Sequence, residues 1–139
     1  MGDHITQRLS IIIKNNLHQG GTIAVRNTLV TRGEPYNRCR KPTLMAPEDV
    51  NKLVICHGEE GTASFCGSAV YGLGVEGSLD LYHGDARIAS LHWNGPWART
   101  GNQFEATNVN SAKYLVNISG IPSHGILGDV SVIVTEVAC

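Results

Sequence analysis

The chain is poor in the residues that mark several large classes of protein. Only two tryptophans, two phenylalanines and four tyrosines occur among 139 residues, and 17% of the residues are charged. Lys and Arg number 11 against 12 for Asp and Glu, so the formal net charge is -1. This balance argues against a general nucleic-acid binder, because such proteins gain affinity by neutralising phosphates. We therefore expect no nucleic-acid partner.

Long apolar runs are also missing. The longest near the start is Ile11-Ile12-Ile13, far below the roughly 20 residues that a membrane-spanning helix needs. The first residues, Met1 to His4, contain no basic region followed by an apolar stretch, which is the pattern of a conventional signal peptide. We expect a protein that is cytoplasmic in its producer, or that is released without such a peptide.

Metal and enzyme signatures are scarce as well. The cysteines Cys39, Cys56, Cys66 and Cys139 show no C-x-x-C spacing, and the six histidines show no H-E-x-x-H spacing. Cys56 and Cys66 lie on neighbouring apolar runs that could meet across a hairpin, so free thiols and a disulfide both remain open. No G-x-S-x-G elbow occurs. We expect no metal, no cofactor and no enzymatic activity; a small hydrolase using His92 is the least favoured alternative.

The chain does contain much glycine and many short alternating runs. Its 42% hydrophobic content supports a core within one domain spanning residues 1–139, and its 16 glycines indicate tight turns. One short helix is predicted at Pro47–Asn51, and Thr31–Pro47 is predicted to be an irregular, basic loop. The pattern predicts an all-β antiparallel sandwich. The predicted strands are Leu9–Lys14, Thr22–Val30, Lys52–Cys56, Ser64–Cys66, Ser78–Tyr82, Arg87–Trp93, Ala112–Ile118 and Val130–Val134.

One glycine run matches a nucleotide-binding pattern. Gly72-Leu73-Gly74-Val75-Glu76-Gly77 has the G-x-G-x-x-G spacing. That motif must open a helix, whose N-terminus binds the pyrophosphate. Here the next residues alternate as a strand, so we interpret the run as a turn that precedes a strand.

The most unusual local sequence is HWNGPWAR, which holds both tryptophans, Trp93 and Trp97, around an Asn-Gly-Pro turn and ends at Arg99. Indole rings favour the membrane–water interface and can face a cationic head group, and an arginine fork pairs with phosphate. We predict a lipid head-group site formed by Trp93, Trp97 and Arg99, with Tyr82 and His83 from a neighbouring turn. Strand alternation also allows Trp93 to lie in the core, and that alternative remains open.

These residues resemble the middle of the aegerolysin family. Gly77 to Tyr82, followed by Trp93-Asn94-Gly95-Pro96-Trp97 and Asn102, is similar to the family's run G-x-x-D-L-Y…W-D-C-P-W…T-N. The likeness extends outward to Leu9–Asn15, Asn110–Tyr114 and Gly125–Val130. It implies a small β-sandwich of the actinoporin type that recognises sphingolipids on membrane surfaces.

The resemblance also implies a partner. Several aegerolysins act with a larger perforin-like (MACPF) protein that makes the pore, and some bacterial members are insecticidal. The expectation is a lipid-recognition component of a two-component pore-forming cytolysin, which acts at the target-cell membrane and assembles into homo-oligomers there. The alternative is a lectin-like, carbohydrate-binding sandwich whose tryptophans stack on sugar rings.

The departures from the family pattern concern head-group choice. Arg8 and Arg32 stand where the family has tryptophans, and Thr100 stands where it has a lysine. Leu73 lies near the position of a glutamate that influences lipid choice in fungal members, and Gly95 replaces the cysteine of W-D-C-P-W. The resemblance therefore carries the fold to this chain but not the choice of lipid.

Overall fold

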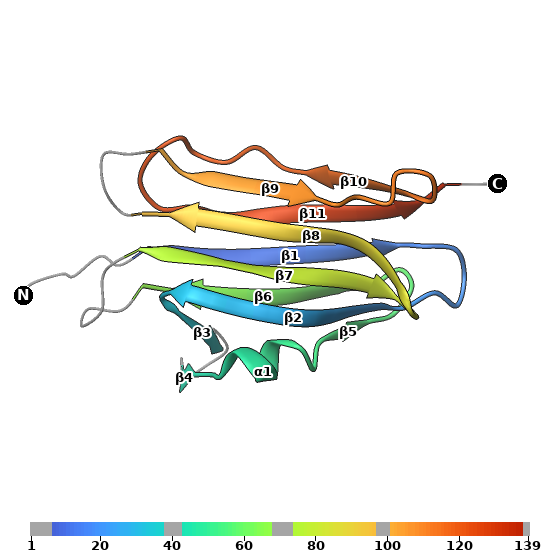
Figure 1. Cartoon of the computed structure of the whole chain (residues 1–139), viewed down its shortest axis with the longest axis horizontal. Coiled ribbons are helices and arrows are strands. Elements are labelled where there is room, and N and C mark those ends of the chain that lie inside the picture. Colours follow the sequence, from blue (N-terminus) through green and yellow to red (C-terminus); the bar gives the residue numbers. More distant parts are fainter. Residues whose placement is uncertain (1–6, 38–42, 68–73, 97–100, 138–139) are drawn as a thin grey trace, which may run out of the picture.

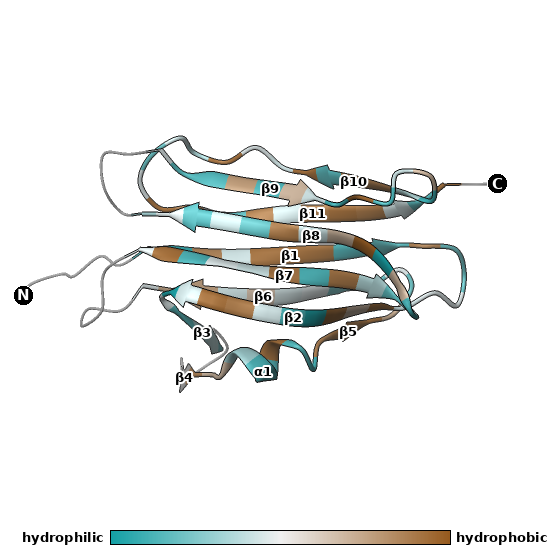
Figure 2. Cartoon of the chain, in the orientation of Figure 1, coloured by the Kyte–Doolittle hydropathy of each residue, from teal (hydrophilic) through white to brown (hydrophobic). Residues whose placement is uncertain are grey.

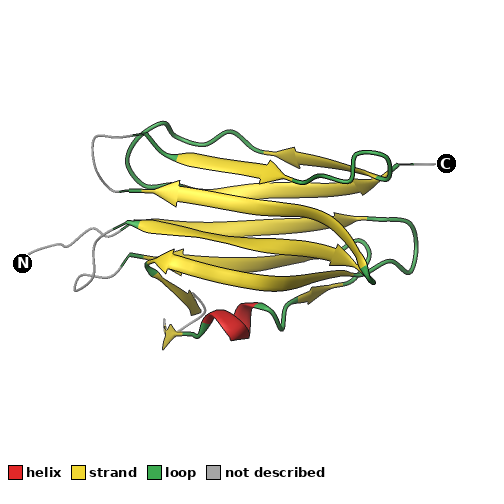
Figure 3. Ribbon diagram, viewed as in Figure 1, coloured by secondary structure: helices red, strands yellow, loops and turns green. Residues whose placement is uncertain are grey.

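The computed structural model describes residues 7–37, 43–67, 74–96 and 101–137. Two sheets pack face to face as a sandwich (Figure 1). Strands dominate the described residues, and the helix α1 is one turn long (Figure 3). The elements in chain order are β1 (Arg8–Asn16), β2 (Ile23–Arg32), β3 (Glu34–Asn37), β4 (Thr43–Leu44), α1 (Pro47–Val50), β5 (Val54–Ile55), β6 (Glu60–Cys66), β7 (Val75–His83), β8 (Ala86–Gly95), β9 (Gln103–Thr107), β10 (Tyr114–Ile118) and β11 (Gly128–Glu136).

The two sheets have different strand orders. One sheet runs β10-β11-β1-β6-β3-β4 and the other runs β5-β2-β7-β8-β9. All of the pairings are antiparallel except β1 with β11, in which Leu9 lies opposite Gly128. The predicted all-β sandwich is confirmed. The parallel pair was not anticipated, because residue alternation shows which face a strand buries but not which strand lies beside it.

The core follows from alternation along the central strands. Ile11 and Ile13 of β1 lie opposite Val130 and Val132 of β11, and all four side chains are fully buried. Figure 2 shows the same alternation as brown and paler or teal bands along these strands. Each such side chain contributes about 1.5–3 kcal/mol when it leaves water, so this layer stabilises the sandwich strongly.

The predicted helix is confirmed, and its sequence explains its start. Pro47 occupies a first-turn position, where its missing N–H costs no hydrogen bond. The Asp49 carboxylate accepts a hydrogen bond from the Ala46 N–H at 3.0 Å. This bond, together with Lys52 nearby, lowers the pKa of Asp49. Val50 is buried, so the turn is held against the side of the sandwich. No helix among the described residues is long and apolar enough to cross a membrane.

The irregular loop predicted at Thr31–Pro47 is wrong in part. Strand β2 reaches Arg32, and β3 and β4 then form a short hairpin in which Pro35 is buried. Gly33 makes this transition possible, because its φ is 80° and a Cβ there would lie 2.6 Å from the Cys66 carbonyl oxygen. The chain thereby passes from one sheet to the other within a single residue, which a pattern of alternation cannot reveal.

Two further elements differ from the sequence prediction. Strand β9 was missed, because its burial alternates only between exposed and half-buried residues at a sheet edge. The sequence pattern predicts Ala112 on a strand face, but Ala112 is exposed and lies in the turn before β10. Tyr114, Val116 and Ile118 do face the core as expected.

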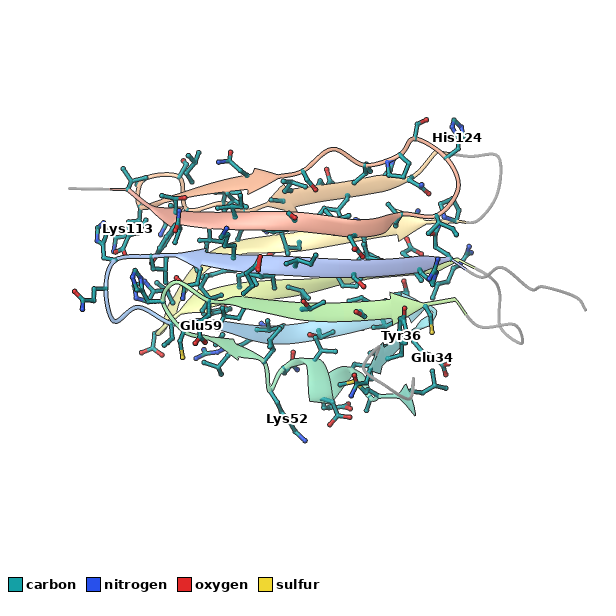
Figure 4. All side chains as sticks on the ribbon, turned by 180° about the vertical axis from the view of Figure 1, so that it is seen from behind. Glu34, Tyr36, Lys52, Glu59, Lys113 and His124 are labelled. Carbon is teal, nitrogen blue, oxygen red and sulfur yellow. The ribbon has the colours of Figure 1, made fainter. Side chains whose placement is uncertain are left out.

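The sandwich has two ends that matter for the site. We call the end where β2, β6 and β8 finish and β1, β7 and β11 begin the loop end, on the left in Figure 1. The opposite end holds the turn between β7 and β8, where Gly84 has a φ of 64°, and we call it the hairpin end. Figure 4, seen from behind, places His124 and Glu34 toward the loop end and Lys113 and Glu59 toward the hairpin end.

Candidate head-group site

Trp93 lies in the core and not on the surface. Its side chain is fully buried, and its ring centroid is 4.6 Å from that of Phe65, with 38° between the ring planes. Strand register places it between Gly77 of β7 and Phe104 of β9. The core alternative is therefore correct for Trp93, and its assignment as a direct head-group contact is wrong in this conformation, because no part of the ring reaches solvent.

The glycine run packs strands closely. A Cβ at Gly77 would lie 2.5 Å from the Leu29 carbonyl oxygen and 2.8 Å from Cζ2 of Trp93, and one at Gly74 would lie 2.7 Å from the Gly95 carbonyl oxygen. Strand β7 begins at Val75, so this part of the run does lead into a strand. The remaining members, residues 72 and 73, lie outside the described residues.

The loop that follows β8 leaves the sandwich at the loop end. Trp97 and Arg99 lie outside the described residues, which stop at Pro96 and resume at Gly101. Asn102 fixes the returning chain. Its N–H donates to the Ser123 carbonyl at 2.8 Å, and its Nδ2 donates to two more carbonyls of the 122–125 segment, at 3.1 and 3.0 Å. The chain is therefore held against the 122–125 segment at Asn102, shortly after the described residues resume.

A buried glutamine ties the same segment to β1. Gln7 is fully buried; its Oε1 accepts a hydrogen bond from the Leu127 N–H at 2.6 Å, and its Nε2 donates to the Gly125 carbonyl at 2.8 Å. The Gly67 N–H donates to the Gln7 carbonyl at 2.8 Å. Sequence reasoning missed this residue, because one glutamine before an apolar strand carries no recognisable signal. Together, Gln7 and Asn102 hold the 122–127 segment in place.

Two arginines lie exposed at the loop end. Arg8 begins β1, and Arg32 ends β2 opposite Glu76, which in turn lies opposite Asn94 of β8. Neither guanidinium forms an ion pair with another residue in the described part of the chain. These are the two positions at which the resemblance expects tryptophans. The end that carries the Trp97 and Arg99 loop is therefore flanked by cations.

Tyr82 and His83 do not join this end. They lie beside the turn between β7 and β8, where Tyr82 is opposite Arg87 and His83 is opposite Ala86. From Arg87 to Trp93 the strand spans six residue steps, which is roughly 20 Å at the rise of a strand. The predicted grouping of Tyr82 and His83 with the tryptophans is therefore wrong, because an antiparallel hairpin carries their turn to the opposite end.

Both side chains are also engaged within the protein. The Arg26 guanidinium carbon lies 4.6 Å from the centroid of the Tyr82 ring, and Arg26 also donates to the Gly84 carbonyl at 3.2 Å. His83 Nδ1 shares a hydrogen bond with the Tyr114 hydroxyl at 2.8 Å. These contacts brace the hairpin end against β2 and β10.

The Tyr114 hydroxyl makes a testable pH prediction. Burial, and then the nearby Glu136, raises the pKa of Tyr114 above its ordinary value of 10.0. The neutral phenol is therefore favoured in the folded protein. Its stabilisation is fully present below about pH 10 and is lost as the pH rises through the folded-state pKa. We expect the unfolding free energy, measured in urea, to fall above pH 10 more steeply in the wild type than in Tyr114→Phe; equal pH dependence would contradict this assignment.

The two described cysteines are free thiols. Cys56 is exposed and Cys66 is half-buried at the end of β6. Because Cys56 precedes that seven-residue strand, the two lie toward its opposite ends and the hairpin disulfide is wrong. Burial, and then Glu34, raises the pKa of the Cys66 thiol. Cys39 and Cys139 lie outside the described residues.

A row of polar residues crosses the outer face of the five-stranded sheet. Ser78, His92 and Glu105 are neighbours on β7, β8 and β9. These are the residue types of a nucleophile–base–acid set, which requires hydrogen bonds between successive members. No such bond joins them, and the buried Nδ1 of His92 has no partner among the described residues. Within those residues, no three His, Cys, Asp or Glu side chains gather as a metal site either.

Comparison with known proteins identifies a matching family and similar proteins. The family model described as Aegerolysin matches residues 6–137. Terrelysin from Aspergillus terreus is 30% identical over 126 residues, covering 90% of this chain and 85% of that protein. Asp-hemolysin from Aspergillus fumigatus is 28% identical over 104 residues, covering 75% of this chain and 74% of that protein.

Solved structures show the same fold. The RahU protein in complex with a TRIS molecule superposes with a TM-score of 0.87 at 23% identity, covering 96% of this chain and 98% of that one. IP-1A from Alcaligenes faecalis superposes with a TM-score of 0.85 at 24% identity, covering 96% and 94%. Because both identities are below 25%, these superpositions show a shared β-sandwich fold and nothing further.

Proposed function

Because the chain belongs to the aegerolysin family, we propose that it recognises a sphingolipid in a target membrane through the loop end of its sandwich. Aegerolysins are non-enzymatic, lipid-binding proteins, and a lipid-binding, toxin-related role follows from membership and from hemolysin-type relatives. The particular lipid, the docking surface, the partner and the absence of catalysis in this chain are the proposal.

One observation carries the choice of surface. The exposed side chains of Arg8 and Arg32 lie at the same end of the sandwich from which the loop with Trp97 and Arg99 departs. A guanidinium fork binds phosphate oxygens in a bidentate manner, and an indole ring favours the interfacial region of a bilayer. The convergence of these groups fits a membrane surface that presents phosphates above a sphingolipid backbone.

The charge pattern indicates how binding gains its energy. With a formal net charge of -1, the whole protein is not drawn to anionic membranes by bulk attraction. Any electrostatic attraction to the membrane must therefore come from the local cations at the loop end. Arginines in place of two family tryptophans favour a head group with an accessible phosphate over one recognised only by aromatic contacts. We propose a phosphosphingolipid as the ligand class.

A division of labour accompanies this proposal. We propose that the protein docks at the surface of the target cell. It then forms homo-oligomers there and recruits a perforin-like partner that makes the pore, with insect cells among the targets.

Vesicle binding tests the docking surface. Phosphatidylcholine vesicles with and without sphingomyelin or ceramide phosphoethanolamine are compared by co-sedimentation. We expect Arg32→Ala and Trp97→Ala to weaken sphingolipid-dependent binding about fivefold or more, which is ~1 kcal/mol or more. Arg87→Ala is the matched control, because Arg87 is also an exposed arginine on the same sheet but lies at the hairpin end.

Three results would contradict the proposal. Equal losses for Arg32→Ala and Arg87→Ala would mean that general charge, and not the loop end, drives binding. Inhibition of vesicle binding by free sugars would favour the lectin alternative. Leakage of sphingolipid vesicles caused by the purified protein alone, at concentrations that only saturate binding, would contradict the division of labour with a partner.

A further inference from the structure

A cavity lies on the side of the sandwich, and neither Arg8 nor Arg32 is among its lining residues. It has a volume of about 540 Å³ and lies between α1, β3 and β6. This volume falls within the range of roughly 300–1,000 Å³ that is typical of ligand pockets. Figure 4 shows Tyr36 of β3 beside this region and Lys52 pointing outward from the segment after α1. Its lining includes Tyr36, Met45, Val50, Leu53, Thr62 and Ser64.

One wall of the cavity is an open strand edge. Strand β3 pairs with β6 only at Glu34 opposite Cys66 and at Pro35 opposite Phe65, after which β3 turns to pair with β4. Strand β1 covers the other edge of β6 along its whole length. Alongside Thr62 and Ser64, no second strand accompanies β6 in residues 43–67 or the other described ranges.

The direction of the backbone groups on this edge follows from the ladder. The Gly67 N–H donates to the Gln7 carbonyl, and the Asn15 N–H donates to the Glu59 carbonyl, so odd-numbered residues of this strand bond toward β1. In an antiparallel pair the bonding direction alternates at every residue. The N–H and C=O groups of Thr62 and Ser64 therefore point away from β1 and toward the cavity.

The facing wall is apolar. Val50 is 5% exposed, Leu53 is packed against the core, and Met45 is half-buried. The charges at this wall neutralise each other, because Lys52 Nζ lies 3.0 Å from Asp49 Oδ1. The cavity thus presents alternating backbone donors and acceptors on one side and aliphatic side chains on the other.

We propose that this cavity binds an extended peptide segment of a protein partner, which adds a strand to the edge of β6. Its backbone would pair with the N–H and C=O groups of Thr62 and Ser64, and an apolar side chain would pack against Val50 and Leu53. Only a peptide supplies matching alternation of N–H and C=O groups. An acyl chain in the same place would leave those groups unpaired, at a cost of about 1–3 kcal/mol each. The site is independent of lipid docking at the loop end.

Amide exchange tests the proposal directly. The probe is an acetylated and amidated hexapeptide of alternating valine and threonine, added to the full-length protein at low millimolar concentration. We expect NMR-detected hydrogen exchange at the Thr62 and Ser64 amides to slow about tenfold or more, because each amide gains a partner. The control peptide has the same side chains, but all of its residue nitrogens are N-methylated, so neither of its edges can donate hydrogen bonds to β6, and we expect no such slowing.

Two variants locate the site. Thr62→Pro removes one N–H that faces the cavity and leaves the bonds of Gly61 and Ala63 to β1, so peptide binding should be lost; Thr62→Val keeps the N–H and should bind normally. If Thr62→Pro does not fold, Met45→Trp, which fills the cavity from the opposite wall, should also abolish binding. Sphingolipid-vesicle binding should be unchanged in these variants, which separates this site from the docking surface.

Several outcomes would overturn the proposal. One is an absence of slowed exchange at Thr62 and Ser64 with the hexapeptide. Others are equal binding of the N-methylated peptide and persistence of binding in the folded Met45→Trp variant. Displacement of the hexapeptide by decanoate would identify an acyl-chain pocket instead.

Discussion

Trp93→Ala is expected to lower the free energy of unfolding by about 3–5 kcal/mol, as for other buried tryptophans and phenylalanines cut back to alanine. Trp93 is fully buried and packs on Phe65, so removal of the indole leaves a cavity between the two sheets. Urea denaturation monitored by far-UV circular dichroism measures the change. The protein should fold at low temperature but with a clearly lower denaturation midpoint.

Trp93→Phe and Trp97→Ala are the controls for this result. Phenylalanine keeps the contact with Phe65 and should recover a large part of the loss. Trp97→Ala should change the unfolding free energy by less than about 1 kcal/mol if the Trp97 ring serves lipid binding. If Trp93→Ala abolished vesicle binding while leaving stability intact, Trp93 would be a surface residue and its core placement would be wrong.

Gly77→Ala should destabilise the protein by about 2–3 kcal/mol, although it adds a single methyl group. The new carbon would lie 2.5 Å from the Leu29 carbonyl oxygen and 2.8 Å from the Trp93 ring. Neither neighbour is the free end of a flexible side chain, so β2 must move away from β7 or the indole must shift. Gly77→Val should cost more and lower the soluble yield. Thermal unfolding of the three proteins under one buffer condition measures the order.

Gly120→Ala is the matched control, because a Cβ at Gly120 would meet no atom within 4 Å. Its unfolding free energy should stay within about 0.5 kcal/mol of the wild type. Equal effects at the two glycines would show that crowding against Leu29 and Trp93 is not the cause of the loss at Gly77. A double variant, Gly77→Ala with Trp93→Phe, should lose less than the sum of its parts, because the two positions share one contact.

The sequence predicts much of the fold because burial on one face leaves a local trace. Val130, Val132 and Val134 occupy alternate positions, separated by Ser131 and Ile133, and the structure buries all three. The helix at Pro47 was likewise visible from its first turn. The pairing of strands leaves no such local pattern in the sequence. Strand β9 is a half-buried edge strand, and β11 pairs with β1 although almost the whole chain separates them.

The candidate site was less predictable, for a related reason. Trp93 and Trp97 are close in sequence, but a strand alternates its faces and then ends, so one indole belongs to the core. Tyr82 and His83 precede the same strand by only a few residues, but the hairpin carries them to the far end. The anchoring role of Gln7 depends on partners more than one hundred residues away, which no local pattern indicates.

The parallel pairing of β1 with β11 also has a consequence for biosynthesis. Strand β1 can pair with β6 midway through synthesis, but its other neighbour, β11, emerges only after residue 127, so Ile11 and Ile13 remain without part of their cover until then. A nascent chain arrested before Gly128 would expose a long apolar strand edge to other chains. We therefore expect the producing cell to face its greatest aggregation hazard from incomplete chains, and folding to occur as one late, post-translational step.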